Sequence, residues 1–82
     1  MVKYEYLMVR WEFVAIGKNL TIIYPNGEQE SIKISFAGTG EVEFLKAINK
    51  FAAQGWELID TSTIPKGSYF SIYAHMHRKI EN

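Results

Sequence analysis

The chain has 82 residues, nine acidic and nine basic side chains, and no cysteine. A chain of this length folds as one domain and buries only about 60 to 65% of the surface that its unfolded form exposes, so its stability is marginal. The absence of cysteine excludes disulfides and thiolate zinc sites. The balanced charge argues against a protein that binds duplex DNA by broad phosphate neutralisation.

The sequence shows no sign of membrane insertion or of division into parts. No stretch approaches the roughly 20 apolar residues of a membrane span, and residues 1–5 lack the apolar core of a secretory signal. There is no linker, internal repeat or low-complexity segment. We therefore expect a single domain over residues 1–82, located in the cytoplasm and without a membrane partner.

The first predicted element is a long strand. Residues 3–13 are rich in aromatic and β-branched side chains and alternate in polarity, as a strand with two different faces does. The more apolar face carries Leu7, Val9, Trp11 and Phe13. We expect this face to contact the helix.

A hairpin is predicted next, from residues 20–24 and 28–36, which flank the turn-forming residues 25–27. A two-residue loop would mix apolar and polar side chains on each face of the hairpin. A three-residue loop, with a type I turn followed by a left-handed glycine, places Leu20 opposite Ile32 and keeps one face apolar. We therefore predict the three-residue loop.

An amphipathic helix is predicted from Glu41 to Gln54, with Thr39 or Gly40 as its N-terminal cap. Acidic residues occupy its first turn and lysines follow later, the order that complements the helix dipole. The expected buried stripe consists of Val42, Leu45, Ile48 and Ala52, with Phe44 and Phe51 beside them.

The segment Gly55-Trp56-Glu57-Leu58 predicts how this helix ends. Gly55 can adopt the left-handed conformation that a helix C-terminus requires. Trp56 then falls where a side chain packs back on the helix, against Phe51. We therefore interpret Trp56 as a core anchor and not as a ligand-binding residue.

Two further strands, at residues 57–63 and 69–79, are joined by a turn at residues 65–68. The element order is therefore β-β-β-α-β-β. The predicted fold class is α+β, a mostly antiparallel five-stranded sheet with one helix packed on one face.

These features together resemble a known family. Tyr4-Glu5-Tyr6 at the start, the amphipathic helix, Gly55-Trp56-Glu57-Leu58 and an aromatic last strand ending in Arg78 are similar to a family of small bacterial and phage proteins labelled domain of unknown function four-one-seven-seven. The likeness covers the first strand and everything from the helix onward, whereas the hairpin of residues 17–36 is longer than in the usual member. The family has no assigned function, so the resemblance implies a fold but no functional residues.

Two short patterns are candidates for ligand sites. Gly38-Thr39-Gly40 before a helix is typical of a phosphate cradle, but Glu41 and Glu43 would both repel phosphate. We expect an ordinary helix cap there. His75 and His77 share one face of a strand, but two ligands are too few for a metal site. We expect no metal.

Catalytic patterns are lacking as well. No serine lies in a nucleophile-elbow sequence, and no pair of carboxylates has a spacing that suggests an acid and a base. We expect no enzymatic activity and no cofactor.

The sheet face opposite the helix is the most distinctive candidate site. Strand alternation places on it an unusual share of aromatic and basic side chains. Tyrosine combines a stacking ring with a polar tip and is enriched at interfaces. The predicted ligand or interface residues are Tyr4, Tyr6, Arg10, Tyr69, Tyr73, His75, His77 and Lys79.

We therefore predict a non-enzymatic, homo-oligomeric binding module, and three uses of this face remain open. Two copies could pack their faces together and complete a core that one copy cannot build. A small anionic aromatic ligand, such as a nucleotide signal sequestered between the subunits of a phage-type protein, could stack on tyrosine while Arg10, His75 or Lys79 meets its phosphate. Single-stranded nucleic acid could bind on a stacking platform, although the neutral charge weakens this alternative.

Overall fold

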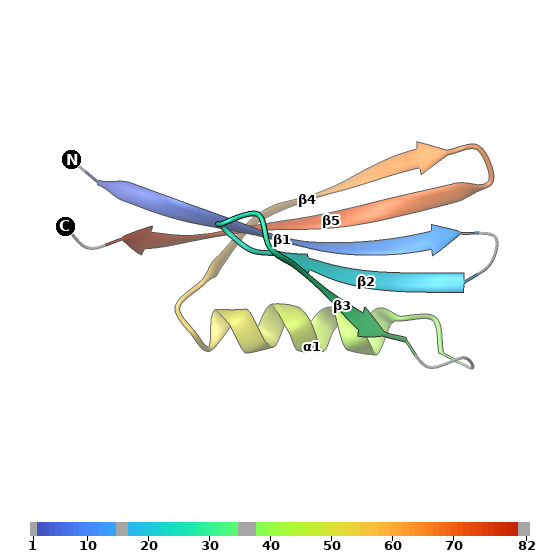
Figure 1. Cartoon of the computed structure of the whole chain (residues 1–82), viewed down its shortest axis with the longest axis horizontal. Coiled ribbons are helices and arrows are strands. Elements are labelled where there is room, and N and C mark those ends of the chain that lie inside the picture. The colour runs from blue at the N-terminus through green and yellow to red at the C-terminus, as the bar shows by residue number, and fades with distance from the viewer. Residues whose placement is uncertain (1, 15–16, 35–37, 81–82) are drawn as a thin grey trace.

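The computed structural model describes residues 2–14, 17–34 and 38–80. Its elements are the strands β1 (Lys3–Val14), β2 (Gly17–Ile23), β3 (Gln29–Lys33), β4 (Glu57–Lys66) and β5 (Tyr69–Ile80), and the helix α1 (Glu41–Ala52) between β3 and β4. The strands form one antiparallel sheet in the order β3-β2-β1-β5-β4 (Figure 1). The predicted α+β class and element order are confirmed.

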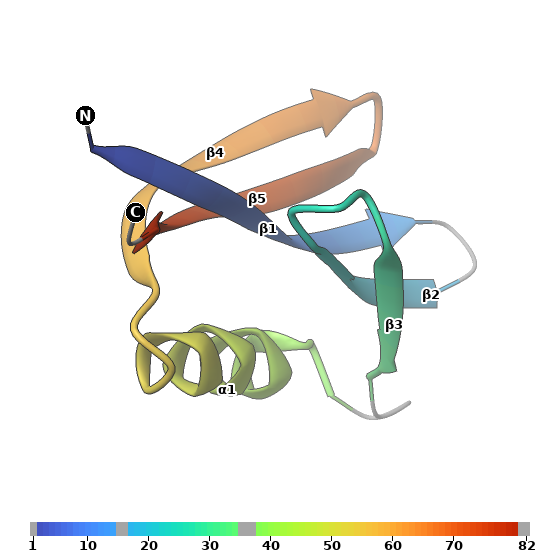
Figure 2. The ribbon, with the colours of Figure 1, turned by 60° about the vertical axis from the view of Figure 1, so that its left-hand side comes forward.

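The helix lies along one face of the sheet and runs antiparallel to β1, whereas the β4–β5 hairpin rises away from it (Figures 1 and 2). The core forms between helix and sheet. Leu7 and Val9 of β1 are buried there beside their register partners Met76 and Ala74 of β5. Trp11 is buried too, so the predicted helix-facing side of the first strand is confirmed.

The β2–β3 hairpin has the predicted three-residue loop. The N–H of Gly27 donates to the carbonyl of Tyr24 at 2.9 Å, and Gly27 has a left-handed φ of 87°. Leu20 pairs with Ile32, as predicted. β3 ends at Lys33, before the predicted end of the strand, and residues 35 and 36 of that prediction lie outside the described residues.

The buried side of α1 differs from the predicted stripe. Val42 and Leu45 are 59% and 57% exposed, and Ala52 is exposed as well. The buried residues are Ala47 and Phe51, with Phe44 and Ile48 partly buried beside them. The physical reason is the size of the aromatic rings, which bury more apolar surface than Val or Leu and so decide how the helix is rotated.

Two aromatic contacts hold α1 in this rotation. The ring of Phe44 packs on Trp11 at a centroid distance of 5.1 Å. The ring of Phe51 meets Tyr24 edge-on at 6.2 Å. The outer face of the helix is left with the smaller apolar side chains.

The C-terminal end of α1 is capped as predicted. The N–H of Gly55 donates to the carbonyl of Ala52 at 3.1 Å, and the N–H of Trp56 donates to the carbonyl of Phe51 at 3.0 Å, which is the Schellman pattern. Gly55 has a left-handed φ of 93°, and Trp56 is buried. The helical residues end at Ala52, two residues earlier than predicted.

The N-terminal end of α1 is shaped by close packing. Gly40 is the cap residue, with a left-handed φ of 99° and without a side-chain cap. Its Cα lies so close to Trp11 and Ile34 that a Cβ would overlap both side chains. The hydroxyl of Thr39 donates to the carboxylate of Glu41 at 2.6 Å. A carboxylate thus lies at the position where a bound phosphate would need positive charge.

Candidate functional site

The predicted site residues lie on one face of the sheet, opposite α1. The register of β1 and β5 places Tyr4 opposite Lys79, Tyr6 opposite His77, and Arg10 opposite Tyr73. We call this surface the tyrosine face. It consists of Tyr4, Tyr6, Arg10, Tyr69, Tyr73, His75, His77 and Lys79.

The members of the tyrosine face are not all close to one another. Tyr69 begins β5 and pairs with Lys66 at the tip of the β4–β5 hairpin, so it is four strand residues away from Tyr73. Near the other end of β5, Tyr4 and His77 stack with their ring centroids 4.5 Å apart and their planes 9° apart. The ring of Tyr6 lies 6.2 Å from the same histidine. Such cross-strand aromatic pairs stabilise the sheet locally.

Three basic side chains of the tyrosine face, those of Arg10, His75 and His77, lie beside carboxylates of the same chain. The Nε of Arg10 lies 3.1 Å from a carboxylate oxygen of Glu12. The Nδ1 of His75 lies 2.9 Å from Asp60, and the Nε2 of His77 lies 3.9 Å from Glu57. The face therefore presents aromatic rings together with basic side chains, most of which already lie beside a carboxylate of the same chain.

The β4 carboxylates were not predicted as part of the site. Asp60 reaches His75 because the β4–β5 register shifts between Leu58 and Asp60, and such a bulge redirects side chains across the sheet. Strand alternation within a single strand carries no signal for this shift. Only the pairing of both strands brings Asp60 and Glu57 next to the histidines.

The described residues were also compared with the requirements of a metal site and of a membrane-spanning helix. Among them, no group of three or more His, Cys, Asp or Glu side chains is arranged to hold a metal ion. No helix in the described part of the chain is long and apolar enough to cross a membrane. The cytoplasmic location expected from the sequence stays a prediction.

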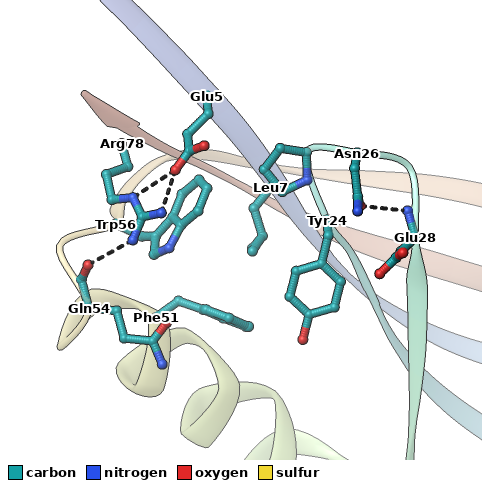
Figure 3. Close-up of a pocket in the computed structure, with 10 residues that line it drawn as sticks. Glu5, Leu7, Tyr24, Asn26, Glu28, Phe51, Gln54, Trp56 and Arg78 are labelled. Atoms are coloured by element: carbon teal, nitrogen blue, oxygen red, sulfur yellow. Dashed lines mark hydrogen bonds and ion pairs between the residues drawn. The ribbon is translucent and has the colours of Figure 1, made fainter. Parts of the chain in front are cut away.

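A second candidate site lies on the helix side of the sheet, at the C-terminal end of α1 (Figure 3). It is a pocket of about 400 Å³, which we call the helix-end pocket. This pocket could not be predicted from the sequence, because its walls come from β1, the β2–β3 loop, the helix end and β5. Its lining residues are Glu5, Leu7, Tyr24, Pro25, Asn26, Glu28, Phe51, Gln54, Trp56 and Arg78.

Arg78 ties one side of the helix-end pocket together. Its guanidinium lies over the ring of Trp56, with Cζ 4.5 Å from the centroid. Its Nε donates to Oε1 of Glu5 at 2.8 Å, and its Nη2 donates to the same oxygen. Its Nη1 donates to the carbonyl of Gln54 at 3.2 Å. Arg78 thus joins the last strand, the first strand and the end of the helix.

Tyr24 forms the opposite side of the helix-end pocket. Its hydroxyl donates to a carboxylate oxygen of Glu30 at 2.5 Å. This hydrogen bond, together with desolvation and the negative charge of Glu30, raises the pKa of Tyr24 above its ordinary value of 10.0. A raised folded-state pKa means that the interaction stabilises the fold below the unfolded-state pKa, and that this contribution is lost as the pH rises through the folded-state pKa.

Glu30→Gln is expected to lower the pKa of Tyr24 toward 10.0, because the substitution removes the carboxylate that favours the protonated phenol. An alkaline titration of the Tyr24 ring carbon by NMR measures this pKa separately from those of the other tyrosines. Glu43→Gln, in the first turn of α1, is the control and should leave the titration unchanged. An unaltered Tyr24 pKa in Glu30→Gln would contradict the assigned cause.

No family model matches the chain, and no curated protein matches it significantly. The resemblance to the family of unknown function therefore stays a prediction.

Proposed function

We propose that the protein is a non-enzymatic binding module that associates with a second copy of itself through the tyrosine face. The observation that supports this most is the combination of exposed rings with basic side chains that mostly lie beside carboxylates on the same face. Tyr4 and Tyr6 are 43% and 59% exposed. Aromatic rings contribute most of the binding energy at protein interfaces, and paired charges are less costly to dehydrate than isolated ones.

The exposed surface of one copy supports this proposal. A compact monomer of 9.5 kDa exposes about 5,000 Å², whereas this chain exposes 5749 Å². The excess, about 700 Å², is close to the roughly 800 Å² that each partner buries in a standard interface. The open, elongated shape of 45 × 24 × 20 Å accounts for the excess, because the sheet has one face that α1 does not cover.

The outer surface of α1 is the main rival interface, because Val42 and Leu45 are exposed there. These two side chains stand among the exposed Glu41, Lys46 and Asn49. Charged side chains such as those of Glu41 and Lys46 are depleted at interface centres. The tyrosine face offers larger and more rigid side chains, which lose less conformational entropy on association.

The ion pairs of the tyrosine face also favour self-association over binding of a nucleotide-like anion or a nucleic acid. A nucleotide-like anion or a single-stranded nucleic acid would have to compete with Glu12 for Arg10 and with Asp60 for His75. A second copy of the chain needs no such displacement. Self-association is therefore our first proposal, and binding of an aromatic anion between the subunits is the second.

Tyr6→Glu is expected to convert a dimer or larger oligomer into a monomer at micromolar concentration, because it places a new charge at the centre of the interface. Light scattering measures the mass, and circular dichroism checks that the fold is kept. Leu45→Glu is the matched control, since Leu45 is equally exposed but lies on the helix. A monomeric wild-type protein, or dissociation by Leu45→Glu alone, would rule out the tyrosine face as the interface.

A further inference from the structure

We propose that the helix-end pocket binds a small organic cation with an aromatic or apolar body. The pocket lies on the helix side of the sheet, so this inference is independent of self-association through the opposite face. Its volume of about 400 Å³ lies within the range of ligand-binding pockets, which is about 300 to 1,000 Å³. The ligand class follows from the floor and the charges of the pocket.

The floor of the pocket is apolar and aromatic. Leu7, Phe51 and Trp56 contribute to it, and each of them is at most 5% exposed. Figure 3 shows Trp56 and Arg78 on one side, Tyr24 on the other, and Leu7 and Phe51 between them. Tyr24 stands edge-on to Phe51. A flat or aliphatic group placed here would contact ring surface on more than one side.

The charges around this floor favour a cation. The ionisable groups of the lining that are charged near neutral pH are two carboxylates, Glu5 and Glu28, and one guanidinium, Arg78. Both hydrogen bonds from Arg78 to Glu5 use the Oε1 atom. The side chain of Glu28 makes no hydrogen bond or ion pair with another described residue. The lining therefore carries one net negative charge.

The surroundings strengthen this preference. The pocket adjoins the C-terminal end of α1, which carries the negative end of the helix dipole. Arg78 already lies over the ring of Trp56. Just outside the lining, the Nζ of Lys50 lies 5.5 Å from the centroid of Phe51 and the carboxylate of Glu30 accepts the Tyr24 hydroxyl, so these two opposite charges leave the charge balance of the lining unchanged. Cations are attracted to the faces of aromatic rings. A ligand with an ammonium or amidinium group near Glu28 and an apolar body on Phe51 would use both the negative charge and the ring surface of the pocket.

Benzamidine, benzamide and benzoate test the proposal, because they share one ring and differ in charge. With the full ¹⁵N-labelled chain, benzamidine should shift the indole N–H of Trp56 and the backbone N–H of Gln54 in a saturable way. Benzamide should bind more weakly, and benzoate should leave these signals in place. The proposal would be overturned by equal binding of benzoate, by silence of all three probes, or by benzamidine shifts confined to the tyrosine face.

Two variants test whether the carboxylate of Glu28 contacts the bound cation. Glu28→Gln should weaken benzamidine binding about tenfold, because a charge-assisted contact to the carboxylate is lost. Glu28 is exposed in the β2–β3 loop, so the fold should be kept. Glu43→Gln, at the other end of α1, removes the same charge from the chain away from the pocket and should leave the affinity unchanged. Equal affinity of Glu28→Gln and the wild type would refute the assigned role of Glu28.

Discussion

Trp56→Ala is expected to lower the free energy of unfolding by about 3 to 5 kcal/mol, the range for removing a large buried aromatic side chain. Trp56 is only 5% exposed and lies against the end of α1, where its own N–H completes the helix cap. The substitution also removes the ring on which the Arg78 guanidinium rests. Small domains have a total stability of about 5 to 15 kcal/mol, so this loss would leave little of the fold.

Denaturant unfolding measures this loss as a shift in the midpoint. Trp56→Phe is the control, because it keeps an aromatic ring beneath the Arg78 guanidinium and should lose less stability than the alanine variant. An unchanged midpoint in Trp56→Ala would show that the core does not depend on the helix end in the way described here.

Gly40→Ala is expected to destabilise the protein by about 2 to 4 kcal/mol, through backbone strain and overpacking together. Gly40 has a φ of 99°, which disfavours any residue with a Cβ. The added Cβ would lie 2.5 Å from Nε1 of Trp11 and 2.9 Å from Cδ1 of Ile34, both closer than atoms tolerate. The helix start and the sheet would have to move apart.

Gly27→Ala is the matched control for this prediction. Gly27 has a similar φ of 87°, but a Cβ there would meet nothing within 4 Å. This variant should therefore lose only the backbone contribution, about 1 kcal/mol. The difference between the two midpoints isolates the packing of the helix start on Trp11. Equal losses would indicate that Gly40 is constrained by its conformation alone.

The parts of the fold that could be predicted depend on neighbouring residues. The cap at Gly55 and Trp56 follows from a pattern six residues long, and its hydrogen bonds are the predicted ones. The three-residue loop follows from the choice that keeps Leu20 opposite Ile32. In both cases the residues that decide the geometry lie within one short stretch of the sequence, so the local pattern predicts it.

The rotation of α1 could not be predicted in the same way. Apolar side chains occupy more than one side of this helix, and the sequence does not say which side meets the sheet. The contacts of Phe44 with Trp11 and of Phe51 with Tyr24 decide it. These contacts join residues that are far apart in the chain, so the predicted stripe with Val42 and Leu45 was wrong.

The two candidate sites also differ in whether local sequence or long-range contacts determine them. Strand alternation was enough to place the rings of the tyrosine face on one side, because alternation is a local property. The carboxylate of Asp60 required the register of β4 against β5, including its bulge. The helix-end pocket required even more distant pairs, such as Arg78 with Glu5, which are 73 residues apart. No short pattern in a single sequence encodes such contacts.

Isotope-filtered NMR on a mixture of labelled and unlabelled chains tests the self-association most directly, because only contacts between copies give cross-peaks. Association through the tyrosine face predicts cross-peaks from the rings of Tyr4, Tyr6 and Tyr73 in one copy to β1 and β5 of the other. The opposite result would be an oligomeric sample in which these rings give no such cross-peaks while Val42 and Leu45 do, or a sample that gives none and has the mass of a monomer.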